Sequence, residues 1–191
     1  RRSLLAFHYQ KKNGRETTRT DYTAEYDLSD QEYPVAIAAP ADRNRAWLDG
    51  LETTLKNDLK QLTDTYYDKF ARKVLYAYSY QPQDPDNDGE PDENPRVAYL
   101  LFRYQANDPA TPKNENKKLD KQTQYGIRGG TADVASFDGN FAAREEAAVA
   151  AAVSGDEVLQ ELLFDPDGKR MMLALAYQEG APVGYTINKY R

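Results

Sequence analysis

Acidic residues recur at alternate positions in one short stretch of the chain, QPQDPDNDGEPDENP (residues 81–95). They occupy the odd-numbered positions of a calcium-binding loop: Asp84, Asp86, Asp88, Glu90 and Asp92. Gly89 falls where such a loop needs a sharp turn. Calcium takes about six to eight oxygen ligands, and this spacing points alternate carboxylates to one side. The spacing therefore predicts a calcium site.

The acidic stretch resembles the DxDNDG loops of EF-hand-like and thrombospondin type 3 repeats, over these few residues only. The resemblance implies calcium as the ligand. The chain departs from that pattern at the last ligand position, where Pro95 replaces a bidentate Glu, and strands rather than helices are expected on either side. The alternative interpretation is a solvated acidic hairpin tip that limits aggregation.

Residues for other kinds of catalytic chemistry are scarce. The chain has no Cys, which excludes disulfides, thiolate nucleophiles and Cys-ligated metals. His8 is the only histidine, so a Ser-His-Asp triad has a single base to use and a zinc site would need several carboxylates. We expect His8 to be an ordinary, partly exposed side chain. The scarcity of catalytic residue types favours a protein that is not an enzyme.

The net charge of −6 is concentrated in the acidic loop, which holds six acids between Asp84 and Glu93. The rest of the chain is neutral, which argues against nucleic acid as a partner of the whole surface. No run of apolar residues is long enough to span a bilayer, so no membrane span is expected.

One segment occurs three times. The copies RRSLLAFHYQ (1–10), RKVLYAYSYQ (72–81) and KRMMLALAYQ (169–178) share a basic pair, an apolar run with a fixed Ala, and a final Tyr-Gln. Side chains of a strand alternate between the two faces of a sheet. The alignment therefore predicts three equivalent strands, with Phe7, Tyr78 and Leu175 on one large, aromatic face that forms the core.

A turn and a second strand follow each copy, which predicts hairpins at about 1–27, 72–105 and 169–191. The middle hairpin is apolar on both faces and is therefore expected at the centre of the sheet. Apolar residues at steps of three and four predict helices over 42–70 and about 141–153, and a short helix from Val158 to Leu163. Residues 106–122 are predicted to form a flexible excursion.

The predicted fold class is α+β: an antiparallel sheet of about six strands from three repeated hairpins, with amphipathic helices packed on one face. We place residues 1–191 in one domain, because the repeats need each other's faces to build a core. The opposite face should carry a mildly apolar patch large enough to need a cover. This predicted binding face consists of Leu75, Ala77, Leu100, Phe102, Met172 and Ala174.

These observations predict a non-catalytic binding or interaction module of an exported or surface-associated, extracytoplasmic protein. Its contact would be the apolar face or the acidic, calcium-binding hairpin loop, and its partner another protein or a second copy of the chain. One alternative is a hydrolase that uses paired carboxylates from residues 84–95 and 132–146. The other is a structural or assembly component whose sheet edges pair with neighbours.

Overall fold

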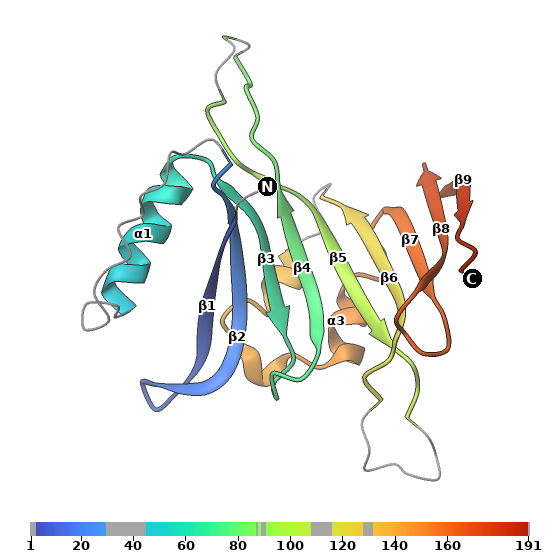
Figure 1. Cartoon of the computed structure of the whole chain (residues 1–191), viewed down its shortest axis with the longest axis horizontal. Coiled ribbons are helices and arrows are strands. Elements are labelled where there is room, and N and C mark those ends of the chain that lie inside the picture. Colours follow the sequence, from blue (N-terminus) through green and yellow to red (C-terminus); the bar gives the residue numbers. More distant parts are fainter. Residues whose placement is uncertain are drawn as a thin grey trace.

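The computed structural model describes residues 3–29, 45–86, 88, 91–107, 116–127 and 132–190. One antiparallel sheet of nine strands dominates it, and every strand lies beside the strand that precedes it in the sequence (Figure 1). The strands are β1 (Ser3–Lys12), β2 (Arg15–Asp27), β3 (Gln61–Tyr67), β4 (Val74–Tyr80), β5 (Arg96–Tyr104), β6 (Leu119–Gly126), β7 (Val158–Phe164), β8 (Met171–Gln178) and β9 (Ala181–Ile187).

The antiparallel sheet is confirmed, but the predicted α+β fold with about six strands and amphipathic helices on one face is wrong. The long helix predicted over 42–70 ends early, because α1 covers only Arg45–Asn57 and Leu59 adopts a positive φ of 55°. The next residues form β3 instead. Its threonines and tyrosines favour an extended chain, and Asp64 and Tyr66 point to one face while their neighbours point to the other.

The second helical region also holds less helix than predicted. It contains α2 (Ala132–Ala135), the 3-10 turn η2 (Phe141–Ala143) and α3 (Glu146–Ala152). Residues 158–163, predicted as a helix, lie in β7, which pairs with β6 and β8 along its length. The predicted excursion 106–122 gives its last residues to β6. These strands are stabilised by neighbours on both sides, which local sequence patterns do not reveal.

The three repeated hairpins correspond to β1–β2 at one edge of the sheet, β4–β5 at its centre and β8–β9 at the other edge. Cross-strand register shows that the first copy is turned over relative to the second. His8 lies opposite Tyr22, Tyr22 opposite Tyr66, and Tyr66 opposite Tyr76. Phe7 therefore points to the other face, where it is 44 % exposed, and its predicted place in the core is wrong.

The face that carries these tyrosines, here called the inner face, receives both helical segments. Leu55 of α1 packs against the small Ala6 and Ala24 of β1 and β2, which let the helix approach closely. The valines of α2 and α3 pack against the central tyrosines of β3, β4 and β5. The inner face of the first copy thus needs small residues, which explains why its large residues face outward.

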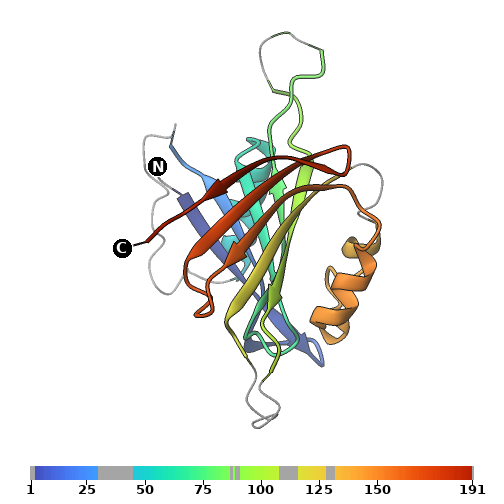
Figure 2. The same cartoon turned by 90° about the vertical axis from the view of Figure 1, so that its right-hand side faces the viewer.

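The short β1–β2 and β3–β4 turns and the long β4–β5 connection lie at opposite ends of the sheet. The β1–β2 and β3–β4 turns lie at the lower end of the sheet in Figure 1, and the long β4–β5 connection projects from the upper end. Figure 2 shows α3 beside the strongly twisted sheet. Among the described residues, no helix is long and apolar enough to cross a membrane.

Candidate functional site

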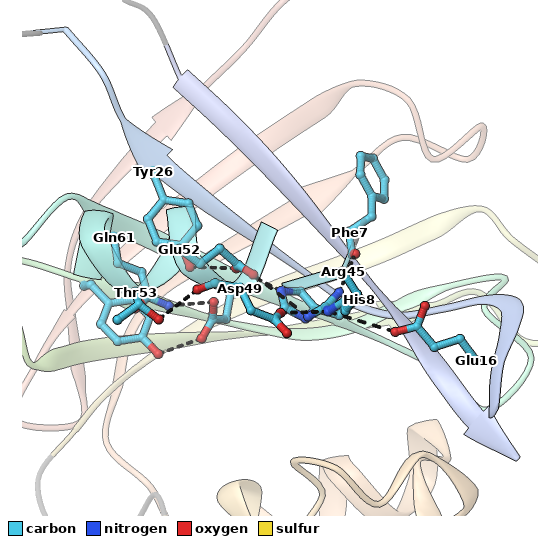
Figure 3. Close-up of polar contacts among 11 residues, drawn as sticks. Phe7, His8, Glu16, Tyr26, Arg45, Asp49, Glu52, Thr53 and Gln61 are labelled. Carbon is cyan, nitrogen blue, oxygen red and sulfur yellow. Dashed lines mark hydrogen bonds and ion pairs between the residues drawn. The ribbon is translucent and has the colours of Figure 1, made fainter. Parts of the chain in front are cut away.

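A pocket of about 380 Å³ opens where β1 and β2 meet the start of α1 and the segment before η2. His8 and Tyr22 come from the two strands, Arg45 is the first residue of α1, and Phe141 begins η2. Figure 3 shows the polar contacts of His8, Arg45 and Glu52 with their neighbours. Segments far apart in the sequence therefore build one site.

Glu52 is the buried anchor of this site. It lies on the same side of α1 as the leucines that face the sheet, and only 4 % of its surface is exposed. Its Oε1 accepts hydrogen bonds from His8 Nε2 at 2.9 Å and from the Tyr26 hydroxyl at 2.8 Å. A carboxylate among apolar helix positions is costly to bury without such donors. Glu52 was not among the candidate site residues predicted from the sequence; an acidic residue among the leucines on one side of a helix is the signal that could have revealed it.

Both nitrogens of His8 are engaged. Arg45 Nη2 lies within hydrogen-bond distance of His8 Nδ1, while Nε2 faces Glu52. A guanidinium can only donate, so Nδ1 must accept and Nε2 carries the proton. The prediction that His8 is partly exposed is wrong, because the residue is buried.

Arg45 ties the start of α1 to β1. Its Nη1 donates to the carbonyl oxygen of Phe7 at 3.3 Å, and its Nε lies 2.7 Å from Asp49 on the next turn of the helix. Glu16 of β2 lies farther away, at 4.0 Å from the same Nε. The guanidinium is about one-third exposed, so part of it remains accessible from the pocket.

The pKa values of Glu52 and Tyr26 are shifted in opposite directions. Burial by itself raises the pKa of Glu52, but the hydrogen bonds from His8 and Tyr26 outweigh it and hold that pKa below its ordinary value. Burial, together with the bond to Glu52, raises the pKa of Tyr26 far above its ordinary value. At neutral pH the carboxylate is therefore charged and the phenol is neutral.

Aromatic rings form the wall behind the pocket. His8 stacks on Tyr22 with ring centroids 4.0 Å apart and an angle of 8° between the rings. The stack continues across the sheet from Tyr22 to Tyr66 at 5.2 Å and from Tyr66 to Tyr76 at 4.7 Å. Neighbouring strands place opposed residues at about this spacing, so the sheet itself spaces the rings.

Arg144 fixes the segment that closes the pocket on its other side. Arg144 follows η2 in the chain and its side chain is fully buried. It donates from Nε to the Phe137 carbonyl at 2.8 Å and from Nη1 to the Asp21 carbonyl at 3.0 Å, and it contacts the Asp21 carboxylate. The guanidinium also lies over the Tyr66 ring, 4.9 Å from its centroid. These contacts fix the chain three residues after Phe141, which lines the same pocket as residues of β1 and β2.

Polar groups at the base of the site are paired with one another. His8, Glu52 and Tyr26 satisfy one another, and Arg144 engages Asp21. The pocket itself is lined by the Lys11 ammonium and the Glu16 carboxylate, which face each other across β1 and β2, and by aromatic surface.

The predicted calcium residues lie at the opposite end of the molecule, in the β4–β5 connection (Figure 1). Carboxylate oxygens of Asp84, Asp86 and Asp88 come within 4.8 Å of one another, and the backbone N–H of Asp88 approaches the other two. Asp92 is exposed nearby, and Glu90 lies outside the described residues. The calcium site stays a prediction.

Five residues of the predicted binding face lie on the outer face of the sheet, and the sixth, Leu75, does not. Register places Ala77 opposite Leu100 on the outer face, with Phe102 and Ala174 on the same side. Met172 is 40 % exposed there. Leu75 is different: it lies at the register shift between β3 and β4 and packs into the main core with the central tyrosines.

The two acidic regions of the hydrolase alternative have separate partners. Asp138, from residues 132–146, accepts hydrogen bonds from Tyr76 at 2.9 Å and from Arg96 at 3.2 Å. Burial raises its pKa, although both partners oppose the rise. The aspartates of the 84–95 region approach one another instead.

No protein-family model, no curated protein and no solved structure matches the chain significantly.

Proposed function

We propose that the chain is a non-catalytic recognition module that binds a small, ring-bearing polar ligand in the pocket beside His8. One observation carries this proposal: polar side chains that already satisfy one another support a pocket of about 380 Å³ with aromatic walls. Small-molecule sites combine concave aromatic surface with a few placed polar groups. An exported or surface-associated setting, expected from the sequence, belongs to the same proposal.

The groups in the pocket define the ligand class. Tyr9, Tyr22 and Phe141 offer ring surface for a flat or puckered ring. Lys11 and Glu16 offer one cationic and one anionic group at the rim. A sugar, an aromatic amino acid or an aromatic carboxylate combines a ring with groups that hydrogen-bond to these side chains.

The test is a titration of the ¹⁵N-labelled chain with three probe sets: monosaccharides, aromatic amino acids and aromatic carboxylates. At least one probe is expected to shift the amide resonances of β1, β2 and the 139–141 segment in a saturable way. Lys11→Gln should weaken that binding, whereas Lys12→Gln, on the neighbouring residue outside this pocket, should not. If no probe shifts these resonances, or if Lys11→Gln binds like the wild type, the proposal fails.

A second candidate, assembly with another copy of the chain, is favoured by the terminal strand β9. Val183, Tyr185 and Ile187 are 62 %, 74 % and 59 % exposed on a strand paired on one side only. Native proteins often protect such an edge with charge or with Pro; β9 contains no charged residue and has Pro182 near its start only. Sedimentation velocity over a wide concentration range decides this candidate, since a monomer throughout would remove it.

A further inference from the structure

The turn between β3 and β4 carries an exposed phenylalanine surrounded by cations. Phe70 is 45 % exposed at the middle of this turn. The charged ends of Arg72, Lys69 and Arg19 lie 5.3, 5.4 and 6.0 Å from the centre of its ring. Cation–π contacts of this length are favourable, and here three cations share one ring. The ring contributes little to the core, so packing does not explain its position.

The β1–β2 turn adds further positive charge beside Phe70. The two turns are in contact, because Gln10 Nε2 donates to the carbonyl oxygen of Asp68 at 3.4 Å and Arg19 reaches the Phe70 ring. The exposed basic residues of this end are Lys11, Lys12, Arg15, Arg19 and Arg72, with Lys69 half-exposed.

Acidic residues offset only part of this charge. Glu145 pairs with Lys69, and Glu146 lies 3.6 Å from Lys73. Glu16 is exposed near Arg45, and Asp68 is buried within the turn. Among the described residues of the two turns, with Glu145 and Glu146 counted, basic side chains still outnumber acidic ones, in a chain whose net charge is −6. The acidic β4–β5 connection lies at the opposite end, so the charge is polarised along the strands.

We propose that this end of the molecule, formed by Phe70 and the basic residues around it, docks peripherally on an anionic lipid surface. Basic side chains attract the negative lipid headgroups, and an aromatic ring among them can enter the boundary between headgroups and acyl chains. This surface lies outside the ligand pocket except for Lys11 and Glu16 at its border, and the proposal does not depend on ligand binding.

The single exposed ring favours a membrane over a single-stranded nucleic acid. Nucleic acids are bound in grooves where successive aromatic side chains stack on successive bases. Here one exposed ring lies at the turn, with three cations within 6.0 Å of its centre. One ring among basic side chains suffices for insertion into the boundary between headgroups and acyl chains.

The experiment is co-sedimentation of the whole chain with vesicles of phosphatidylcholine alone and of phosphatidylcholine mixed with phosphatidylglycerol. Binding is expected only to the anionic vesicles, and it should weaken as salt screens the charges. Arg19→Gln combined with Arg72→Gln should weaken binding about 25-fold, at about fivefold for each charge. Phe70→Ala should weaken it about tenfold through lost insertion.

Phe7→Ala is the matched control, since Phe7 has nearly the same exposure but lies on the outer face of β1 away from both turns. It should bind as the wild type does, and circular dichroism should show that all variants remain folded. Equal binding to both kinds of vesicle, no binding, or an unchanged affinity in Phe70→Ala and the double variant would overturn the proposal. So would binding to single-stranded DNA without binding to anionic vesicles.

Discussion

Replacing Glu52 by Gln tests whether the buried carboxylate holds α1 to the sheet. The substitution keeps the shape of the side chain and removes its charge. His8 and Tyr26 then donate to a neutral oxygen instead of a carboxylate. Hydrogen bonds to charged groups contribute about 1.5–3 kcal/mol and neutral ones about 0.5–1.5 kcal/mol. Two bonds that each lose about 1 kcal/mol lower the free energy of unfolding by about 2 kcal/mol.

The matched control is Asp49→Asn on the same helix. Asp49 contacts the same Arg45 as Glu52 does, but its side chain is 55 % exposed. An exposed pair within one helix contributes only about 0.3–0.5 kcal/mol. Urea unfolding followed by circular dichroism separates the two variants, because an m-value of about 2 kcal/mol per M converts the effect of Glu52→Gln into a midpoint shift of about 1 M.

The effect of Glu52→Gln must also depend on pH. The folded-state pKa of Glu52 lies below its ordinary value. The stabilisation is therefore complete above the unfolded-state pKa of about 4.3 and is lost as the pH falls through the lower folded-state pKa. The difference between wild type and variant should be largest at neutral pH and should shrink in acid. Equal stability at pH 7, or a difference that grows in acid, would refute the assignment of Glu52 as a charged anchor.

Three further predictions concern other parts of the chain. Gly168→Ala should lower the free energy of unfolding, measured by urea, by about 3–5 kcal/mol, because φ is +66° and a Cβ would lie 2.4 Å from the backbone nitrogen of Leu119. The control is Gly180→Ala, where φ is +77° but the space around the Cβ is open. It should lower the free energy of unfolding by only about 1–2 kcal/mol in the same assay. Arg144→Met should cost about 3–5 kcal/mol by leaving Asp21 without its buried cation, and a wild-type thermal midpoint would contradict this. Calcium should raise the melting temperature by several degrees and a chelator should reverse the rise if the acidic loop binds the ion, whereas identical melts would leave it a surface tip.

The sequence predicted the sheet better than the helices. The repeated segments revealed three strand pairs and the central position of the second, because alternation and turn residues are local signals. The apolar spacing from Leu59 to Phe70 also fits a helix, but residues 61–67 pair with β2 and β4. Strand pairing depends on partners elsewhere in the chain, and so a single periodic stripe could not decide between the two structures.

The candidate site was less predictable than the fold. His8 and Glu52 are 44 residues apart, and neither has a motif around it. The nearest signal was an acidic residue within the leucine stripe of a predicted helix, since a buried carboxylate needs donors. Which donors it finds depends on the turned-over register of the first repeat, which brings His8 rather than Phe7 to the inner face.

The sequential order of the nine strands affects how the chain folds and which strands unfold locally. Every pairing joins neighbours along the sequence, so contact order stays low for so large a sheet, and hairpins can form early and add to one another. Amide hydrogen exchange should then be slowest in β3, β4 and β5, which have strands on both sides and helices over them. It should be fastest in β9, where every residue is exposed and one backbone edge meets solvent.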